Sequence, residues 1–195
     1  APLMGSIQTW IRTNWTTAST PGAAAKPAGA VAGATTRTPS TVAQQTAFSE
    51  AALKIVIKKV FEQGGTPSML VVPPTQKQKV SAFAGIAEQR YAAPSNKQTT
   101  IIGAADVYLS DFGTLSVVPD RFMTPDVAAT GTGEQALVLD PTMLSIATLR
   151  PFQSTELAQA GDATKHQMLT EYTLQVNNEA AHGIVADLSL IHISE

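Results

Sequence analysis

The fold is indicated most directly by residues 49–74, which read SEAALKIVIKKVFEQGGTPSMLVVPP. Apolar side chains recur there every three or four residues and lysines fall on the other side, which predicts an amphipathic helix over Glu50 to Gln63. Ser49 or Thr46 is expected to cap its start, and Gly64-Gly65 to provide a left-handed exit. The clearest element of the chain is therefore a helix with one buried face.

Further elements follow from short apolar runs and the turn residues between them. Residues 69–72 are apolar and closed by two prolines, which predicts a short buried strand. Thr75 is expected to cap a second helix that continues through Phe83. Residues 107–118 carry two β-type runs around Asp111-Phe112-Gly113, a pattern typical of a hairpin with glycine in its loop.

The remaining strands are predicted from alternation of polar and apolar residues. Residues 137–139 form a short apolar run, and Asp140-Pro141 after it is expected to open a helical turn. Apolar and polar residues alternate over residues 172–176, which predicts a strand with one solvent-exposed face. Residues 143–152 are expected to pair with it across a turn near Gly161-Asp162. Together these elements predict an α+β fold with antiparallel strand pairs rather than a repeating βαβ unit.

Composition limits the classes of function. The chain has 195 residues, 13 basic and 15 acidic side chains, no cysteine and 44% hydrophobic residues. A chain of this length and apolar content suits one or two compact units. The absence of cysteine excludes disulfide scaffolds and cysteine-based zinc or redox sites. We find no apolar run of the ~18 residues needed to span a bilayer and no leader typical of secretion. A net charge of −2 indicates no general attraction to nucleic acid.

The amino-terminal part differs in composition from the rest. From Thr16 to Thr41, 23 of 26 residues are Ala, Thr, Gly, Pro or Ser. Such a stretch buries too little apolar area to offset the entropy of ordering it, so it is predicted to be a long surface loop or flexible segment. Trp10 and Trp15 precede this stretch and need something to pack on.

Several motifs that look like reactive sites have simpler explanations. Asp111-Phe112-Gly113 spells the magnesium-binding tripeptide of protein kinases, but the sequence lacks the kinase catalytic and glycine-rich loops, so we interpret it as a turn. Gly131-Thr132-Gly133 lacks the third glycine of a dinucleotide fingerprint. His166, His182 and His192 show no metal-ligand spacing and are expected to be hydrogen-bonded or solvated.

The other polar motifs also give no indication of a site. The acidic residues around the hairpin, where Asp favours turns, are Asp106, Asp111 and Asp120. The basic cluster, expected to be the solvated face of the helix, is formed by Lys54, Lys58 and Lys59. Asn14-Trp15-Thr16 matches the glycosylation pattern, and we interpret the match as coincidence. Serine-nucleophile motifs are missing from the sequence, so we predict no catalytic, cofactor-binding or metal-binding residue and no enzyme.

A series of segments resembles a phage coat protein. They are Gly65-Thr66-Pro67-Ser68 with Val71-Val72 and Pro74, Gln78-Lys79 with Ser81-Ala82-Phe83, residues 105–113 (ADVYLSDFG), residues 117–123 (VVPDRFM), residues 137–141 (LVLDP) with Leu149-Arg150-Pro151, and Gly161-Asp162 with residues 171–174 (EYTL) and 178–183 (NEAAHG). In their order and spacing they resemble the Salmonella-phage-type major head protein family, a branch of the tailed-phage coat proteins with the Hong Kong 97 fold.

The resemblance covers roughly residues 5–187 and implies how the chain is divided. It implies an α+β Hong Kong 97-like fold with peripheral and axial domains, in which the amino-terminal arm, extended loop and spine helix are missing from this chain. Residues 1–45 would be the end of the spine region and the Ala/Thr-rich surface loop, and residues 46–187 the capsid domain with axial and peripheral parts. Residues 188–195 resemble a translated sequencing adapter and are expected to be a non-native tail.

The resemblance also implies a function. The chain would be a structural major capsid protein, made in the bacterial host cytoplasm, that self-assembles into the icosahedral head shell of the virion around phage DNA. Its partners would be copies of itself in hexamers and pentamers, together with decoration, scaffold and portal proteins, with only weak non-specific contact to DNA, no membrane and no cofactor. Two alternatives stay open. One is a small α+β enzyme or ligand-binding domain with a phosphate-binding loop at Gly64-Gly65 or Gly131–Gly133, and the other is an encapsulin-type compartment shell protein.

Overall fold

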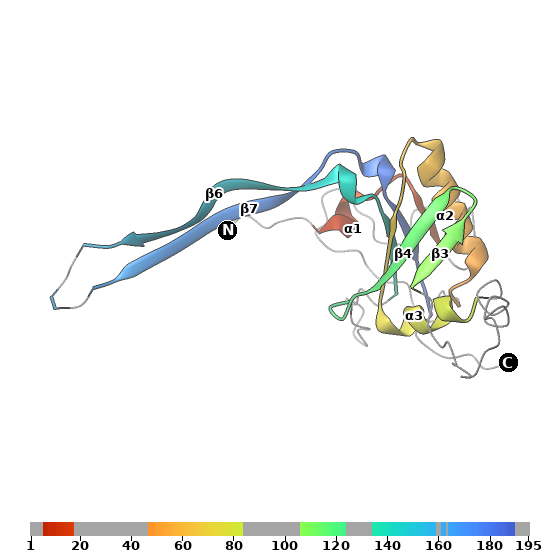
Figure 1. The fold of residues 1–195 in the computed structure, drawn as a ribbon, viewed down its shortest axis with the longest axis horizontal. Helices are drawn as coiled ribbons and strands as arrows, with labels where there is room; N and C mark the ends of the chain where they lie inside the picture. Colours follow the sequence, from red (N-terminus) through yellow and green to blue (C-terminus); the bar gives the residue numbers. More distant parts are fainter. Residues whose placement is uncertain are drawn as a thin grey trace, which may run out of the picture.

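The protein consists of a sheet domain and a long hairpin that projects from it (Figure 1). The computed structural model describes residues 6–17, 47–83, 106–123, 134–158, 161–162 and 164–189. Within these residues the strands form one six-stranded sheet and one two-stranded sheet. The predicted α+β class is confirmed.

The six-stranded sheet has the order β1-β8-β5-β2-β4-β3. Its strands are β1 (Trp15–Thr17), β2 (Met69–Val72), β3 (Val107–Ser110), β4 (Gly113–Pro119), β5 (Ala136–Leu139) and β8 (Gly183–Ala186). The predicted strands at residues 69–72, 107–110, 114–118 and 137–139 are confirmed within these bounds.

The predicted antiparallel pairs are present, but the six-stranded sheet is mixed and also contains two parallel pairs. β2 pairs in parallel with β4, and β1 pairs in parallel with β8. In the first case the chain crosses from β2 through α3 and the edge strand β3 before it returns as β4, and such a crossover allows parallel neighbours. The other pairs in this sheet are antiparallel.

Helix α2 (Glu50–Glu62) matches its prediction at both ends. The Ser49 hydroxyl accepts a hydrogen bond from the backbone N–H of Ala52 at 3.3 Å, and Lys54 pairs with Glu50 at 2.9 Å. That ion pair is the main reason why the pKa of Glu50 lies below its usual value. After the helix, Gly64 has φ +83°, the left-handed conformation in which glycine is strain-free.

Helix α3 (Pro74–Ser81) begins two residues earlier than predicted and ends two residues before Phe83. Pro73 is the N-cap residue and Pro74 occupies the first helical position, where its fixed φ suits a helix start. Thr75 therefore lies inside the first turn, and the prediction that it caps the helix is wrong.

The two faces of the six-stranded sheet are covered by different elements. One face carries α2 and the α3 side chain Val80, packed on Leu70, Val138 and Val185. The other face holds a smaller cluster in which Ile11 and Trp15 pack with strand residues of β5 and β8. Trp15 is thus buried, as its size required.

The amino-terminal residues that the structure describes differ in part from the prediction. A short helix α1 (Ile7–Trp10) leads to β1, so Thr16 and Thr17 belong to the sheet and not to a loop. The physical reason is that Thr is a good strand former and here pairs with β8. Residues 18–46, which contain the rest of the predicted loop, lie outside the described residues.

The long hairpin consists of β6 (Leu144–Glu156) and β7 (His166–Val176). Its antiparallel register pairs Leu144 with Val176 at the base and Glu156 with His166 near the tip, which confirms the predicted pairing across a turn at 161–162. A short 3-10 turn, η3 (Pro141–Met143), leads into β6 as predicted from Asp140-Pro141. A second one, η4 (Glu179–Ala181), leads from β7 to β8.

Two residues of the predicted adapter-derived tail pack on the domain. Leu188 is buried with the α2 cluster, and its N–H donates to the carbonyl of Glu134 at 2.9 Å. The Gln76 side-chain amide donates to the carbonyl of Ser189 at 3.0 Å. These contacts do not test the origin of residues 188–195, which stays a prediction, and residues 190–195 lie outside the described residues.

Candidate assembly surface

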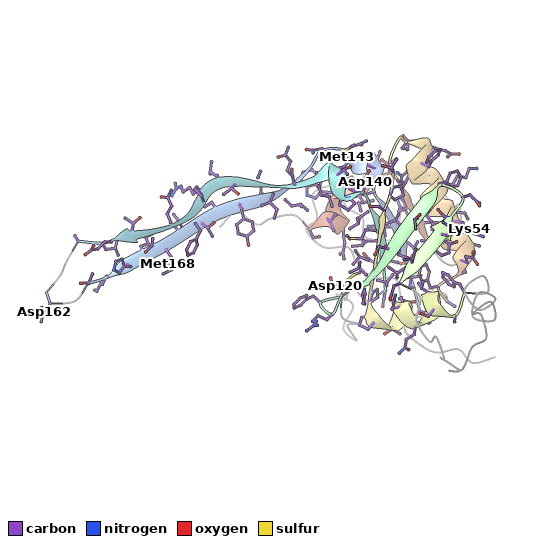
Figure 2. All side chains as sticks on the ribbon, in the orientation of Figure 1. Lys54, Asp120, Asp140, Met143, Asp162 and Met168 are labelled. Carbon is purple, nitrogen blue, oxygen red and sulfur yellow. The ribbon has the colours of Figure 1, made fainter. Side chains whose placement is uncertain are left out.

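The long hairpin reaches far beyond the sheet domain. At about 3.3 Å per residue, the eleven residues of β7 span roughly 35 Å. Figure 2 shows Met143 at its base, beside the domain, and Met168 and Asp162 far out toward its tip. Side chains in the outer part of the hairpin therefore cannot pack on the sheet domain of their own chain.

One face of the hairpin, here called the apolar face, is lined by Leu144, Ile146, Met168, Tyr172, Leu174 and Val176. The register places them together, because Ile146 lies opposite Leu174 and residues two apart on a strand share a face. Ile146 is 70% exposed, Met168 65% and Tyr172 58%. The prediction that only one face of this strand is exposed to solvent is thus wrong, since the apolar face is also largely open to solvent.

The opposite face is mostly polar. Ser145 lies opposite Gln175, and Arg150 pairs with Glu171 at 3.3 Å. The register shifts on both sides of Arg150, and the two large apolar residues in this bulged part of β6, Leu149 and Phe152, are 79% and 69% exposed. The bulged part borders a shallow hollow lined by Leu149, Arg150, Pro151, Gln153, Thr155, Gln167 and Leu169.

Exposed apolar side chains are concentrated on this hairpin. Among the described residues, seven of the fourteen large hydrophobic side chains that are exposed belong to it or to the residue after β6: Ile146, Leu149, Phe152, Leu157, Met168, Leu169 and Tyr172. A lone two-stranded hairpin is at best marginally stable in water. Contiguous exposed apolar surface marks interaction sites. The hairpin is therefore the candidate site, and it suits contact with other protein.

The base of the hairpin is fixed to the domain by Asp140. Its carboxylate accepts hydrogen bonds from the N–H and hydroxyl of Thr142, at 3.0 and 2.6 Å, and from those of Thr66, at 3.3 and 3.2 Å. Burial alone would raise the pKa of Asp140, but these four donors outweigh burial and hold the pKa below its usual value. The first turn of the hairpin is thereby tied to the loop before β2.

The returning strand is fixed by a second set of contacts. The carboxylate of Glu179 accepts hydrogen bonds from the backbone N–H groups of Arg12 and Thr13 and from the Thr13 hydroxyl. The buried side-chain amide of Asn14 donates to the carbonyl of Ala180. The loop before β2 therefore holds one end of the hairpin, and the segment between α1 and β1 holds the other.

His182 lies between these two sets of contacts. Its ring is fully buried, and Nδ1 accepts a hydrogen bond from the backbone N–H of Asp140 at 3.2 Å. Burial lowers the pKa of His182, against the attraction of the Asp140 and Glu179 carboxylates. The expectation of a hydrogen-bonded histidine is confirmed here, and the other described one, His166, is exposed on β7.

A smaller apolar surface lies at the β3 edge of the sheet. Val107 and Leu109 of the edge strand and Val118 of β4 are exposed on the face opposite α2 and α3. Phe122, just beyond β4, is also exposed. This edge is a second surface that other protein could cover.

The motifs set aside in the sequence have structural roles. Asp111-Phe112-Gly113 is the loop between β3 and β4, and Phe112 packs on Phe61 with ring centres 4.9 Å apart. Asp106 pairs with Lys77 at 3.1 Å, and Asp120 accepts from the N–H of Phe122. The turn interpretation is confirmed.

The lysine cluster is solvated only in part, and the glycosylation motif agrees with its interpretation. Lys54 and Lys58 extend into solvent, whereas Lys59 donates to the carbonyl of Trp15 at 3.2 Å. The buried Asn14 could not accept a glycan in this fold. Residues 131–133 and His192 lie outside the described residues.

The described residues contain neither a cluster of metal ligands nor a membrane-spanning helix. Nowhere in them do three or more His, Asp or Glu side chains come together as ion ligands. The helices of this part of the chain are too short or too polar to cross a membrane.

Sequence reasoning missed the length of the apolar face and the polar contacts at the hairpin base. The length of the apolar face had a signal in the sequence. Every second residue from Val176 back to Met168 is apolar, with one polar exception at Thr170. The polar contacts had none, because Asp140 and His182 are 42 residues apart and meet only in the folded chain.

Comparison with known proteins identifies the family. The model of the SU10 major capsid protein family matches residues 1–189. Among solved structures, the chain is similar to the holo-SrpI encapsulin complex of Synechococcus elongatus PCC 7942, seen by cryo-electron microscopy, with 11% identity and a TM-score of 0.45. That match covers 76% of this chain and 53% of the encapsulin chain, so this chain spans about half its length. A search of curated proteins found no match. Because the family model matches nearly all of its residues, the chain belongs to the SU10 major capsid protein family.

Proposed function

We propose that this chain is part of a major capsid subunit that self-assembles into the icosahedral head shell of a tailed phage. The observation that carries the proposal is the long hairpin, whose apolar face is exposed and cannot be covered by its own sheet domain. Family membership supports a structural role for that surface. The partner that a shell offers to every subunit is another copy of the same chain.

Repeated contact is the physical basis of this function. Closed shells form when a surface on one subunit meets a complementary surface on a copy related by rotation. A hairpin about 10 Å wide and roughly 35 Å long offers only a modest contact area, below that of a stable dimer. Modest contacts suffice in a shell because each subunit makes several of them at once. Hexamers and pentamers of this subunit, with scaffold, decoration and portal proteins as further partners, follow from the same proposal.

The proposal includes the Hong Kong 97 fold and the place of the protein in the virion. We assign the sheet domain to the axial part of such a subunit and the long hairpin to the peripheral part. The subunit would be made in the cytoplasm of the bacterial host. With a net charge of −2, its contact with packaged DNA would be weak and non-specific.

We also propose that the subunit has no catalytic activity. Of the two loops offered for the enzyme alternative, Gly131–Gly133 lies outside the described residues, and Gly64-Gly65 follows the carboxyl end of α2, the end of a helix that repels anions. Gly65 is packed so closely that an added Cβ would lie 2.7 Å from the Cα of Ala181. The encapsulin alternative has the same mechanics and differs in genetic context, since terminase and portal genes should neighbour a phage gene.

The test is assembly of the full-length subunit that contains this chain. We expect hollow particles or capsomers by negative-stain electron microscopy and sedimentation. Replacing Ile146 and Tyr172 together with serine should abolish the particles while the circular dichroism of the soluble chain is unchanged, because both side chains are exposed. The matched control replaces Ser145 and Gln175, which lie opposite each other on the polar face, with alanine and should assemble normally.

Two results would contradict the proposal. One is normal particle yield from the apolar-face variant. The other is a full-length protein that stays a monodisperse monomer and binds nucleotide, which would favour the enzyme alternative.

A further inference from the structure

We propose that His182 is an acid-sensitive latch that holds the base of the long hairpin against the sheet domain. The latch itself depends only on the fold, whereas its use in shell assembly rests on the proposed function. In the neutral form the ring links the point where the chain leaves the domain for the hairpin to the point where it returns, and protonation breaks this link.

The position of His182 makes it part of the hairpin base. The chain leaves the domain at Asp140, directly after β5, and returns through η4 to His182, directly before β8. The hydrogen bond from the Asp140 N–H to Nδ1 spans these two points, 42 residues apart in sequence. Figure 2 shows Asp140 where the hairpin meets the domain. A change at this ring therefore acts on both strands at once.

The geometry requires a neutral ring. Because Nδ1 accepts a hydrogen bond, it carries no proton, and the proton of the neutral ring lies on Nε2. Nε2 is buried and finds no hydrogen-bond partner among the described residues. A second proton on Nδ1 would point at the Asp140 N–H, so two donors would face each other and a charge would be buried.

The carboxylates around the ring favour its protonated form, but they do not outweigh the effect of burial. Among the described residues, the carboxylates that act on His182 are Asp140, at the end of β5, and Glu179, in η4. Both favour the protonated ring, yet burial is the larger effect and the pKa of His182 lies below its ordinary 6.5. The Asp140 carboxylate accepts hydrogen bonds from Thr66 and Thr142. The Glu179 carboxylate accepts them from Arg12 and Thr13.

The direction of the pH effect follows from this depression. The released ring binds a proton more readily than the latched ring, so the latch is strongest above about pH 6.5 and weakens as the pH falls below it. Each pH unit between the two pKa values changes the opening equilibrium by up to tenfold. Asp140 cannot cause the same change, because its pKa is held below its usual 3.8.

Loss of the His182 link would let the hairpin change its angle to the domain. Asp140 would keep its bonds to Thr66, and Glu179 its bonds to Arg12 and Thr13, so the domain would stay folded while the base loosens. In an assembled shell, such a change would alter which surface of a neighbouring copy the apolar face meets. The latch thus links acidity to the direction of the assembly surface.

Amide hydrogen exchange of this chain in solution tests the latch without requiring assembly. We expect the opening equilibrium of peptides covering residues 136–144 and 177–186, corrected for intrinsic exchange, to rise by up to about tenfold between pH 7.5 and pH 5.5. Peptides from β2 and β4 should change little. In His182→Asn the amide oxygen can still accept from the Asp140 N–H but does not titrate, so the rise should vanish. The control His166→Asn, on the exposed part of β7, should behave like the original chain.

A second measurement covers the case in which His182→Asn does not fold. The ring signals of His182 in the original chain, followed by NMR, should titrate below pH 6.5. The latch is overturned by a flat exchange profile in the original chain, by an unchanged acid response in a folded His182→Asn, or by His182 titrating at or above 6.5. A failure of the full-length subunit to form particles would contradict only the proposed function.

Discussion

Replacing Gly183 with alanine tests how closely α2 packs on β8, the contact that positions the returning end of the long hairpin. An added Cβ at Gly183 would lie 2.3 Å from Cγ1 of Val56, 3.0 Å from Cγ2 of Val60 and 3.2 Å from the carbonyl oxygen of Asn14. Real Cβ contacts do not fall below 3.0 Å, so Val56 must move. Because Val56 is fully buried, it has little room to do so.

The expected loss follows from overpacking. One extra methyl group in a close-packed core costs about 1–3 kcal/mol of the free energy of unfolding. Val56→Ala alone should cost about 2 kcal/mol, since it removes buried apolar volume. In the double variant the new methyl group fills part of the space that Val56 leaves. The double variant should therefore be more stable than the sum of the two losses predicts, by about 1 kcal/mol or more.

Urea denaturation of the four proteins, followed by circular dichroism, gives this coupling energy directly. Val56→Ala should relieve the overpacking only in part, because Val60 and the Asn14 carbonyl still crowd the new methyl group. As a control, Ala replaces Gly64, where the left-handed φ of +83° penalises the substitution but no atom lies within 4 Å. That variant should show no coupling to Val56→Ala. Additive losses for Gly183→Ala and Val56→Ala, within about 0.5 kcal/mol, would refute the packing described here.

Two further outcomes are expected. Val56→Asp places an unpaired charge in the core beneath α2 and should prevent folding, whereas normal soluble expression would contradict the placement of this helix. Asp140→Asn should lower the free energy of unfolding by about 1–2 kcal/mol at neutral pH, because charge-assisted hydrogen bonds at the hairpin base are weakened. A carboxylate with a lowered pKa stabilises the fold above its unfolded pKa of 3.8 and less as the pH falls, so the variant should lose less stability below pH 4 than the original chain. An identical acid dependence of both proteins would contradict this role.

The elements that could be predicted from sequence are those whose signals are local. The spacing of apolar residues from Leu53 to Val60 depends only on the helical period, and the helix begins and ends beside the residues that indicated it. The hairpin around Gly113 likewise carries its own turn residue. In contrast, the parallel pairs β2–β4 and β1–β8 join strands that other elements separate in sequence, and no local residue type encodes such a partner.

The candidate site was less predictable than the fold, for a reason that lies in its chemistry. A catalytic site shows in sequence as reactive residue types, but an assembly surface is made of the same Ile, Met, Tyr and Leu that form a core. The alternation at residues 172–176 predicts an apolar side for the strand, and the natural inference is that this side is buried. Only the position of the strand, in a hairpin that projects from the domain, shows that Tyr172 and Ile146 stay exposed.

This difference also explains why the hairpin base is polar. A projecting hairpin transmits any force on its apolar face to the few residues where its strands meet the domain. Apolar packing at that place would fix no direction, whereas hydrogen bonds with defined geometry do. Asp140, Glu179 and Asn14 supply such bonds to backbone groups of η3, of the segment between α1 and β1, and of η4, respectively. His182 is the member of this set whose ordinary pKa lies nearest neutrality, and burial lowers that pKa, so the stiffness of the base and its response to acid depend on the same ring.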